Sequence, residues 1–216
     1  MMRIAITQRV ERVATHGEQR DCLDQRWAAL LEGLGLDLVP VPNGLAQPQQ
    51  WFERQKVSGL ILSGGNDLCH LPGASNASLE RDRTEHTLLS LARDRDLPVL
   101  GVCRGMQMLN HFLGGDLAPL SGHAGCMHDV SAVSTDARFA GYAEVNSFHN
   151  WGIAQAGLAP DLHARVVAAD GSIEAAVHQT LPWIAIMWHP ERPSANAGLD
   201  AALIRHLFFR KDTPCA

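Results

Sequence analysis

The chain contains 216 residues, of which 46% are hydrophobic and 19% charged, and its 18 basic and 23 acidic side chains give a formal net charge of −5. This balance is typical of a globular protein and excludes the disordered and fibrous classes. The negative charge provides no attraction for nucleic acid or an anionic membrane surface. No apolar run approaches the ~18 residues that a membrane-spanning helix needs. We therefore predict a single domain over residues 1–216 that binds neither nucleic acid nor membranes.

Cysteine usage and the N-terminal sequence favour a reducing cytoplasm. The five cysteines are odd in number, widely spread and without a CxxC pair: Cys22, Cys69, Cys103, Cys126 and Cys215. This spacing predicts neither a disulfide framework nor a zinc finger. The first residues run directly into an apolar alternation and lack the features of a secretory signal. We expect a cytoplasmic protein.

The first half of the chain alternates short apolar runs with segments of helical period. Strands are predicted at residues 4–7, 38–41, 59–62 and 98–102. Helices are predicted at residues 22–34, 49–56, 84–94 and 106–113, the last one ended by Gly114 and Gly115. The segment 70–83 is predicted to be a long loop.

The second half is rich in strands, and a final helix follows them. Strands are predicted at residues 129–133, 143–148, 164–168, 173–178 and 184–188, and the helix at residues 199–209. Two of these strands are joined by a short turn at residues 169–172, which is typical of an antiparallel hairpin. The strand–helix alternation of the first half implies a parallel sheet covered on both faces. We predict an α/β three-layer sandwich whose mostly parallel central sheet gains antiparallel strands in the second half.

A candidate nucleophile lies where a buried strand meets a helix. Gly101-Val102-Cys103-Arg104-Gly105 has the form of a nucleophile elbow, GxSxG, with cysteine in place of serine. The small flanking residues allow a tight turn, from which we expect an exposed thiol. The positive end of the helix dipole favours the thiolate. A cysteine that only packs in the core is the alternative interpretation.

A candidate base and its orienting group are found in His189-Pro190-Glu191. Pro190 favours an extended backbone at His189, and residues i and i+2 of an extended segment point to one side. Glu191 can then hold the imidazole while its other nitrogen faces the thiol. Upstream, Ser63-Gly64-Gly65-Asn66 follows a predicted strand, and its glycines would let backbone N–H groups approach an oxyanion. Taken separately, each of these motifs is also compatible with an ordinary surface pair or turn.

In this order, the three motifs resemble the class I glutamine amidotransferase family, with its flavodoxin-like sandwich, over nearly the whole chain. The sequence after Cys103, Arg104-Gly105-Met106-Gln107, is similar to the γ-glutamyl hydrolase branch of that family. Further stretches, at residues 6–9, 62–68, 145–150, 172–175 and 187–189, resemble hydrolases that release glutamate and cytidine diphosphoramidate from γ-glutamyl-CDP-amidate during bacterial capsule biosynthesis.

The resemblance implies a role for each matching position. Cys103, His189 and Glu191 would form the catalytic triad, and the backbone N–H groups of Gly65 and Arg104 the oxyanion hole. The implied substrate-binding residues are Gly64, Asn66, Gln107, Asn146, Ser147, His149, His123 and His128. A packed core histidine is the alternative interpretation of His149.

Two histidines, His123 and His128, flank Cys126 in a segment that could suggest a metal site. His-x4-His with a central cysteine is not a usual zinc ligand spacing, so we predict no metal here. We predict instead a polar loop whose imidazoles bind phosphate oxygens of the leaving group. Arg9 and Arg20 are candidates for the same role, although a solvated surface position explains each equally well.

The predicted reaction is amide hydrolysis through a glutamyl thioester, without a metal or organic cofactor. The resemblance implies a small-molecule γ-glutamyl substrate and no obligatory synthetase partner. Three alternatives stay open: a glutaminase subunit that supplies ammonia to a separate synthetase, a hydrolase of γ-glutamyl-γ-aminobutyrate or similar amides, and a non-catalytic protein that shares the cysteine elbow. The His-x-Glu motif argues against the last. The sequence indicates no oligomeric state.

Overall fold

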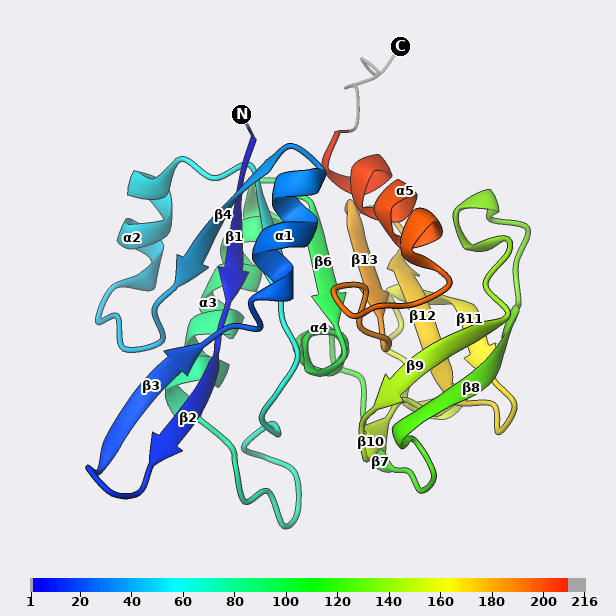
Figure 1. The fold of residues 1–216 in the computed structure, drawn as a ribbon, viewed down its shortest axis with the longest axis horizontal. Helices are drawn as coiled ribbons and strands as arrows, with labels where there is room; N and C mark the ends of the chain where they lie inside the picture. The colour runs from blue at the N-terminus through cyan, green and yellow to red at the C-terminus, as the bar shows by residue number, and fades with distance from the viewer. Residues whose placement is uncertain (1, 210–216) are drawn as a thin grey trace.

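The computed structural model describes residues 2–209 and contains a nine-stranded sheet in the order β4-β1-β5-β6-β13-β12-β11-β8-β9 (Figure 1). Its strands are β1 (Met2–Thr7), β4 (Leu36–Val41), β5 (Gly59–Leu62), β6 (Val99–Val102), β8 (Ala124–Ala132), β9 (Glu144–Phe148), β11 (Leu162–Ala168), β12 (Ile173–His178) and β13 (Trp183–Ile186). Two small hairpins pair β2 (Arg9–Val13) with β3 (Glu18–Cys22) and β7 (Ala118–Pro119) with β10 (Trp151–Gly152). The helices are α1 (Arg26–Gly33), α2 (Pro48–Gln55), α3 (Leu79–Asp94), α4 (Arg104–Phe112) and α5 (Ala197–Phe208), with short 3-10 turns η1 (Ala137–Phe139) and η2 (Gln155–Gly157).

The sheet is parallel in one half and antiparallel in the other. From β4 to β13, every neighbouring pair of strands is parallel. From β13 to β9, every neighbouring pair is antiparallel. The strand β13 is therefore where the direction of pairing changes, and it lies beside β6, the strand that leads into Cys103.

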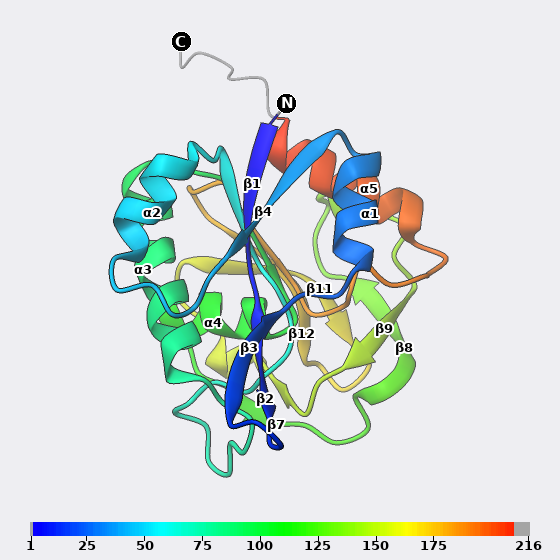
Figure 2. The ribbon, with the colours of Figure 1, turned by 60° about the vertical axis from the view of Figure 1, so that its left-hand side comes forward.

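Helices cover both faces of the sheet, as Figure 2 shows: α1 and α5 lie on one side, and α2, α3 and α4 on the other. Side chains alternate between the two layers along a strand. On β1, Ile4 and Ile6 pack with the α1 and α5 residues Trp27 and Leu207, whereas Ala5 belongs to the core under α2, α3 and α4. These observations confirm the predicted α/β sandwich with a parallel half and an antiparallel half.

Several elements differ from the sequence-based prediction, and those nearest to the predicted site residues are described here. The hairpin β2–β3 was not predicted, because its residues are mostly polar and carry no apolar alternation. The helix α3 begins at Leu79, inside the segment predicted to be a loop, and Ser78 caps it by accepting a hydrogen bond from the backbone N–H of Arg81. The strand β8 begins at Ala124, so His128 lies on a strand and the polar loop predicted around it is wrong.

No helix within residues 2–209 has both the length and the apolar character needed to cross a membrane.

Candidate active site

Cys103 occupies a sharp turn between β6 and α4, with φ 53° and ψ −109°. A positive φ is uncommon for a residue with a Cβ atom and costs free energy that the surrounding structure must supply. The turn is possible because its flanking residues are glycines. A Cβ atom on Gly105 would lie 2.1 Å from the carbonyl oxygen of Leu62, and one on Gly101 would lie 2.8 Å from that of Gly105. The elbow motif is therefore a steric requirement.

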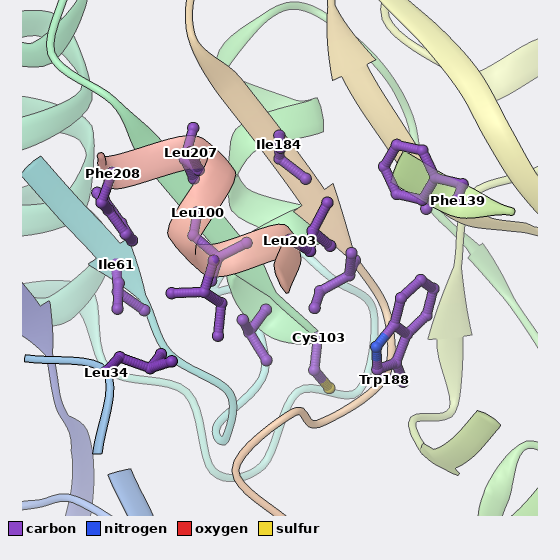
Figure 3. Close-up of a cluster of buried hydrophobic side chains, with 14 of the residues drawn as sticks. Leu34, Ile61, Leu100, Cys103, Phe139, Ile184, Trp188, Leu203, Leu207 and Phe208 are labelled. Carbon is purple, nitrogen blue, oxygen red and sulfur yellow. The ribbon is translucent and has the colours of Figure 1, made fainter. Parts of the chain in front are cut away.

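The thiol side chain is buried, which corrects the expectation that it is exposed. Cys103 is 5% exposed and belongs to the hydrophobic cluster beneath α1 and α5. Figure 3 shows its sulfur at the edge of that cluster, beside Trp188. Its backbone N–H donates a hydrogen bond to the carbonyl of Ile186 on β13. The hydrogen bond to β13 holds the Cys103 backbone, and the hydrophobic cluster holds its side chain. Only a small part of the residue is exposed.

His189 and Glu191 come together just after β13. The imidazole Nδ1 lies 2.7 Å from Glu191 Oε1. Asn146 on β9 holds the His189 peptide at both ends, because its side-chain oxygen accepts from the His189 N–H at 2.9 Å and its amide donates to the His189 carbonyl at 3.1 Å. Burial lowers the pKa of His189, but the interaction with Cys103 and the Glu191 carboxylate outweigh it and raise the pKa to about 9. The arrangement therefore favours the protonated imidazole at neutral pH.

The loop after β5 approaches the other side of the imidazole. A Cβ atom on Gly64 would lie 2.7 Å from His189 Cε1 and 3.5 Å from Cys103 Cβ, so only glycine fits there. Gly65 follows with a φ of +83°, in the left-handed region. These two residues line the pocket together with Cys103, and the role of the Gly65 N–H group in an oxyanion hole stays a prediction.

The fully buried Arg81 on α3 fixes that loop. Its guanidinium donates hydrogen bonds to the carbonyls of Ser63 at 2.6 Å, Gly64 at 3.1 Å and Gly65 at 2.5 Å. Carbonyls held in this way point away from the pocket, which leaves the N–H groups free to face it. The sequence analysis missed this residue, because a single arginine in a predicted loop carries no recognisable signal.

The carboxylates of Glu85 and Asp82 compensate for the positive charges of two buried arginines, Arg81 and Arg104. Glu85 accepts a hydrogen bond from Arg81 Nε at 2.9 Å and forms an ion pair with Arg104, which also pairs with Asp82. Burial and the neighbouring Arg104 lower the pKa of Arg81 to about 10, so it remains charged at neutral pH. The α3 side chains therefore connect the loop after β5 to the first residue of α4.

A pocket of about 390 Å³ is lined by the side chains of Cys103, His189 and Glu191. Its lining includes the triad side chains and Gly65, together with Arg9 from β2, Trp27 from α1, Phe148 from β9 and Arg192. The Arg192 guanidinium stacks 3.8 Å from the centre of the Phe148 ring, and this ring meets His189 edge to face. Phe148 lies in the segment 145–150 that carries the family resemblance, whereas Arg192 was not predicted, because a single arginine after Glu191 carries no recognisable signal.

Several residues with a predicted substrate role are engaged by the protein backbone. The Asn66 side chain forms two hydrogen bonds with the Val10 backbone, at 2.8 and 2.9 Å, and so ties β2 to the loop after β5. Gln107 donates to the carbonyl of Trp151 at 2.8 Å, and Ser147 donates to that of His123. Arg20 pairs with Glu18 on the exposed hairpin. Contact of these residues with substrate stays a prediction.

The three histidines with a predicted substrate role lie together around Glu174, outside the pocket over Cys103. His123, His128 and His149 surround the buried Glu174, and none of them is among the described residues that line the pocket over Cys103. Their assignment to the leaving group also stays a prediction, and the structure gives it no contact with the pocket.

The other described cysteines differ from Cys103 in their surroundings. Burial and a hydrogen bond with Asp82 raise the pKa of Cys69 to about 11. Cys22 lines the pocket at the end of β3, and the Cys126 thiol donates to the Gly122 carbonyl. Cys215 lies outside the described residues.

Comparison with known proteins agrees with this geometry. The model of the peptidase C26 family matches residues 3–191. The chain belongs to that family. It is a class I glutamine amidotransferase-like γ-glutamyl hydrolase and cleaves an amide C–N bond.

Two curated relatives and one solved structure illustrate the similarity. Gamma-glutamyl-CDP-amidate hydrolase of Campylobacter jejuni is 33% identical over 192 residues, which is 88% of this chain and 90% of that protein. The carbamoyl phosphate synthase small chain of Nitratidesulfovibrio vulgaris is 31% identical over 164 residues, which is 75% of this chain but 39% of that protein. A glutamine amidotransferase from Thermotoga maritima shares the fold, with a TM-score of 0.69 and 14% identity, and the match covers 95% of this chain and 96% of that one.

Proposed function

We propose that this enzyme hydrolyses γ-glutamyl-CDP-amidate to glutamate and cytidine diphosphoramidate, and that it acts in capsular polysaccharide modification. The similarity to the Campylobacter jejuni hydrolase along most of both chains supports this substrate. The observation that carries the proposal is the pocket itself, in which Cys103, His189 and Glu191 lie below two arginines, Arg9 and Arg192. A γ-glutamyl group would face the thiol, and a diphosphate would meet the guanidinium groups.

The chemistry divides into acylation and deacylation. The Cys103 thiolate attacks the γ-carbonyl carbon, forming a C–S bond, and the oxyanion is held by the N–H groups of Gly65 and Arg104. The imidazolium of His189 donates its proton to the departing nitrogen as the C–N bond breaks. His189 then takes a proton from water, the hydroxide attacks the thioester, and the C–S bond breaks to release glutamate. Glu191 holds the imidazole throughout.

A phosphoramidate leaving group suits the two arginines that line the pocket and the chemistry of the reaction. Arginine recognises phosphate oxygens through paired N–H donors, which compensates for the overall negative charge of the chain. A nitrogen bonded to phosphorus is less basic than an alkylamine, so its expulsion needs less protonation by His189. Binding energy from the nucleotide can also be used at the reacting centre, so truncated substrates should lose kcat as well as affinity.

A panel of γ-glutamyl amides tests the proposal. With the isolated protein, we expect kcat/KM for γ-glutamyl-CDP-amidate to exceed that for glutamine by at least ~100-fold, or about 2.7 kcal/mol of transition-state binding. Equal values for glutamine, γ-glutamyl-aminobutyrate and the nucleotide substrate would overturn this substrate and leave only the general γ-glutamyl hydrolase.

The pocket arginines provide a sharper test. Arg192→Ala should lower kcat/KM for the nucleotide substrate by about 10-fold or more, because a charged hydrogen-bonding partner of the diphosphate is lost, while glutamine hydrolysis changes little. Arg54→Ala is the matched control, since Arg54 is exposed on α2 and is not among the described residues that line the pocket. Equal effects of Arg192→Ala on both substrates would place the nucleotide elsewhere.

A glutaminase subunit is the second candidate, and the similarity to a carbamoyl phosphate synthase small chain favours it. That function predicts slow glutamine hydrolysis by the isolated chain and strong activation by a synthetase partner. Efficient hydrolysis of the nucleotide substrate without any partner would exclude it.

A further inference from the structure

A compact group of metal-binding side chains lies in the antiparallel half of the sheet, outside the catalytic pocket. His123 precedes β8, His128 lies on β8, His149 follows β9, and Glu174 lies on β12. Single donor atoms of His123, His128 and Glu174 all lie within 4.8 Å of one another. Glu174 is fully buried, and its two oxygens face the three imidazoles.

The facing atoms have no hydrogen-bond partner among the described residues. These atoms are Nδ1 of His123, Nε2 of His128, Nε2 of His149, and both carboxylate oxygens of Glu174. Buried polar atoms are nearly always satisfied, and leaving one unsatisfied costs about 1–3 kcal/mol. Five unsatisfied atoms gathered around one buried carboxylate therefore indicate a missing positive partner at this place.

The outer nitrogens fix which ring atoms carry lone pairs. His123 Nε2 lies 2.9 Å from Asp170 Oδ2, and His149 Nδ1 lies 3.1 Å from the carbonyl of Trp151. Because these oxygens accept hydrogen bonds, the outer nitrogens must be the N–H donors. In the neutral rings, the inner nitrogens of both residues then direct lone pairs at a carboxylate. This outer arrangement is how proteins orient histidines that ligate metals.

The distance of each inner nitrogen from the Glu174 carboxylate is compatible with a shared small ion, with His123 and His149 facing Oε1 and His128 facing Oε2. His128 Nε2, His149 Nε2 and His123 Nδ1 lie 3.4, 3.6 and 3.8 Å from the nearest Glu174 oxygen. In tetrahedral zinc sites with bonds of about 2.0–2.1 Å, neighbouring ligand atoms are ~3.4 Å apart. Three imidazoles and one carboxylate suit zinc and exclude a preference for calcium or magnesium.

We propose that His123, His128, His149 and Glu174 bind one Zn²⁺ ion as a closed structural site, with Asp170 orienting His123. The His-x4-His segment alone does not have a usual zinc ligand spacing. The fourth ligand and the third histidine come from other strands, and only the fold brings them to this segment.

The ion would connect β8, the end of β9 and β12 at the side of the catalytic pocket. The His123 carbonyl accepts hydrogen bonds from Ser147 Oγ and from the His149 N–H, so the site also fixes the segment that carries Asn146. Asn146 in turn holds the His189 peptide. Zinc would thus stabilise the position of the base without contacting the substrate.

Metal analysis of the full chain, purified without a polyhistidine tag, tests the site. We expect about one zinc per chain by plasma mass spectrometry, and the strong visible bands of four-coordinate cobalt when Co²⁺ replaces zinc. Glu174→Gln and His128→Ala should lose the zinc and the cobalt bands. His163→Ala is the matched control, because His163 is exposed on the adjacent strand β11 and should retain both.

The alternative to a zinc ion in this cluster is a proton on an imidazole, because contact with Glu174 raises the pKa of His128. If protons alone satisfy the cluster, the protein will contain no zinc, the chelator-treated chain will give no cobalt bands at neutral pH, and added zinc will not raise the unfolding temperature. Those results would overturn the proposal. Should Glu174→Gln fail to fold, Asp170→Asn keeps the ligands and should weaken zinc affinity by about 10–100-fold, whereas unchanged affinity would contradict the role of Asp170.

Discussion

Cys103 combines a strained backbone, a buried side chain and a charged partner, and each of these properties has a separate cause. The positive φ comes from the elbow and its glycines, and the burial comes from the hydrophobic cluster to which the side chain belongs. The charge comes from His189, whose raised pKa favours the imidazolium. Reactivity at this residue therefore depends on the thiolate fraction and on access through the pocket, rather than on surface exposure.

Alkylation should distinguish Cys103 from the other cysteines. At neutral pH we expect iodoacetamide to modify Cys103 before Cys69, because the pKa of Cys69 is raised to about 11 and its thiolate is scarce. Peptide mass spectrometry over a time course measures the order, with Cys103→Ala as the control that folds but has no activity. Faster modification of Cys69 or Cys126 without loss of activity would contradict the assignment of the nucleophile.

The pH dependence of kcat/KM should reflect the loss of the proton from His189. With a pKa of about 9, His189 loses its proton as the pH rises through that value, so kcat/KM should fall on the alkaline side near pH 9. Glu191→Gln removes one of the charges that raise this pKa, so the alkaline limb should move to lower pH. Because Glu191 orients the base and forms no bond with substrate, kcat should fall substantially but not to zero.

Pre-steady-state measurement of acylation across this pH range separates chemistry from product release. His189→Ala should be far more damaging than Glu191→Gln. Two variants with activity equally close to wild type would show that the triad assignment is wrong.

Among the elements, α3 has the largest influence on the site without contributing a triad residue. It places Arg81, Glu85 and Asp82 between the loop after β5 and Arg104. Breaking a buried ion pair by removing one partner costs about 3–5 kcal/mol, because the remaining charge is left without compensation. The helix therefore couples the stability of the core to the position of the oxyanion hole.

Substituting Arg81 tests its role in positioning. Arg81→Lys keeps the charge but cannot span three carbonyls, so we expect kcat to fall by about 10–100-fold with little change in KM. Affinity for a γ-glutamyl aldehyde, whose adduct resembles the oxyanion, should fall in parallel. Arg83→Lys, exposed on the same helix, is the control. Loss of stability with unchanged aldehyde affinity would show that Arg81 supports the fold alone.

The predictability of each element from sequence depended on its surroundings. The strands β5 and β12 were predicted with their observed bounds, because both are short, mostly apolar segments between turn residues. The start of α3 was missed because its first turns bury charged residues, Arg81 and Glu85, which do not mark an apolar face. The motifs around Cys103 and His189 are local and could be recognised, whereas the carbonyl contacts of Arg81 form only in the tertiary fold.

At the scale of the whole molecule, one buried carboxylate joins α5 to the antiparallel half. Asp200 Oδ1 accepts hydrogen bonds from Tyr142 OH and Trp188 Nε1, both at 2.9 Å, and its Oδ2 has no partner among the described residues. Burial raises the pKa of Asp200, and the two hydrogen bonds offset this only in part. The folded protein therefore holds this proton more tightly than the unfolded chain does.

That difference gives a pH dependence of global stability with a definite sign. As the pH rises from the ordinary carboxyl pKa through the raised value, Asp200 loses its proton in the folded state and its contribution to stability is lost. Asp200→Asn keeps both hydrogen bonds through Oδ1 and carries no charge, so its free energy of unfolding should increase relative to wild type as the pH rises. Urea unfolding of both proteins between acidic and neutral pH measures the difference. A difference that does not change with pH, or that shrinks, would contradict this account.

The place of β13 in the sheet has a consequence for the folding of the chain during its synthesis. This strand lies between β6 and β12, yet it is the last of the sheet strands to be synthesised. The chain emerges from the ribosome N-terminus first, so β6 and β12 emerge before β13, which lies between them in the sheet. His189 follows β13 and reaches Cys103 only when that strand inserts. A partly made chain therefore carries a thiol without its base, and the enzyme becomes active only when its sheet is complete.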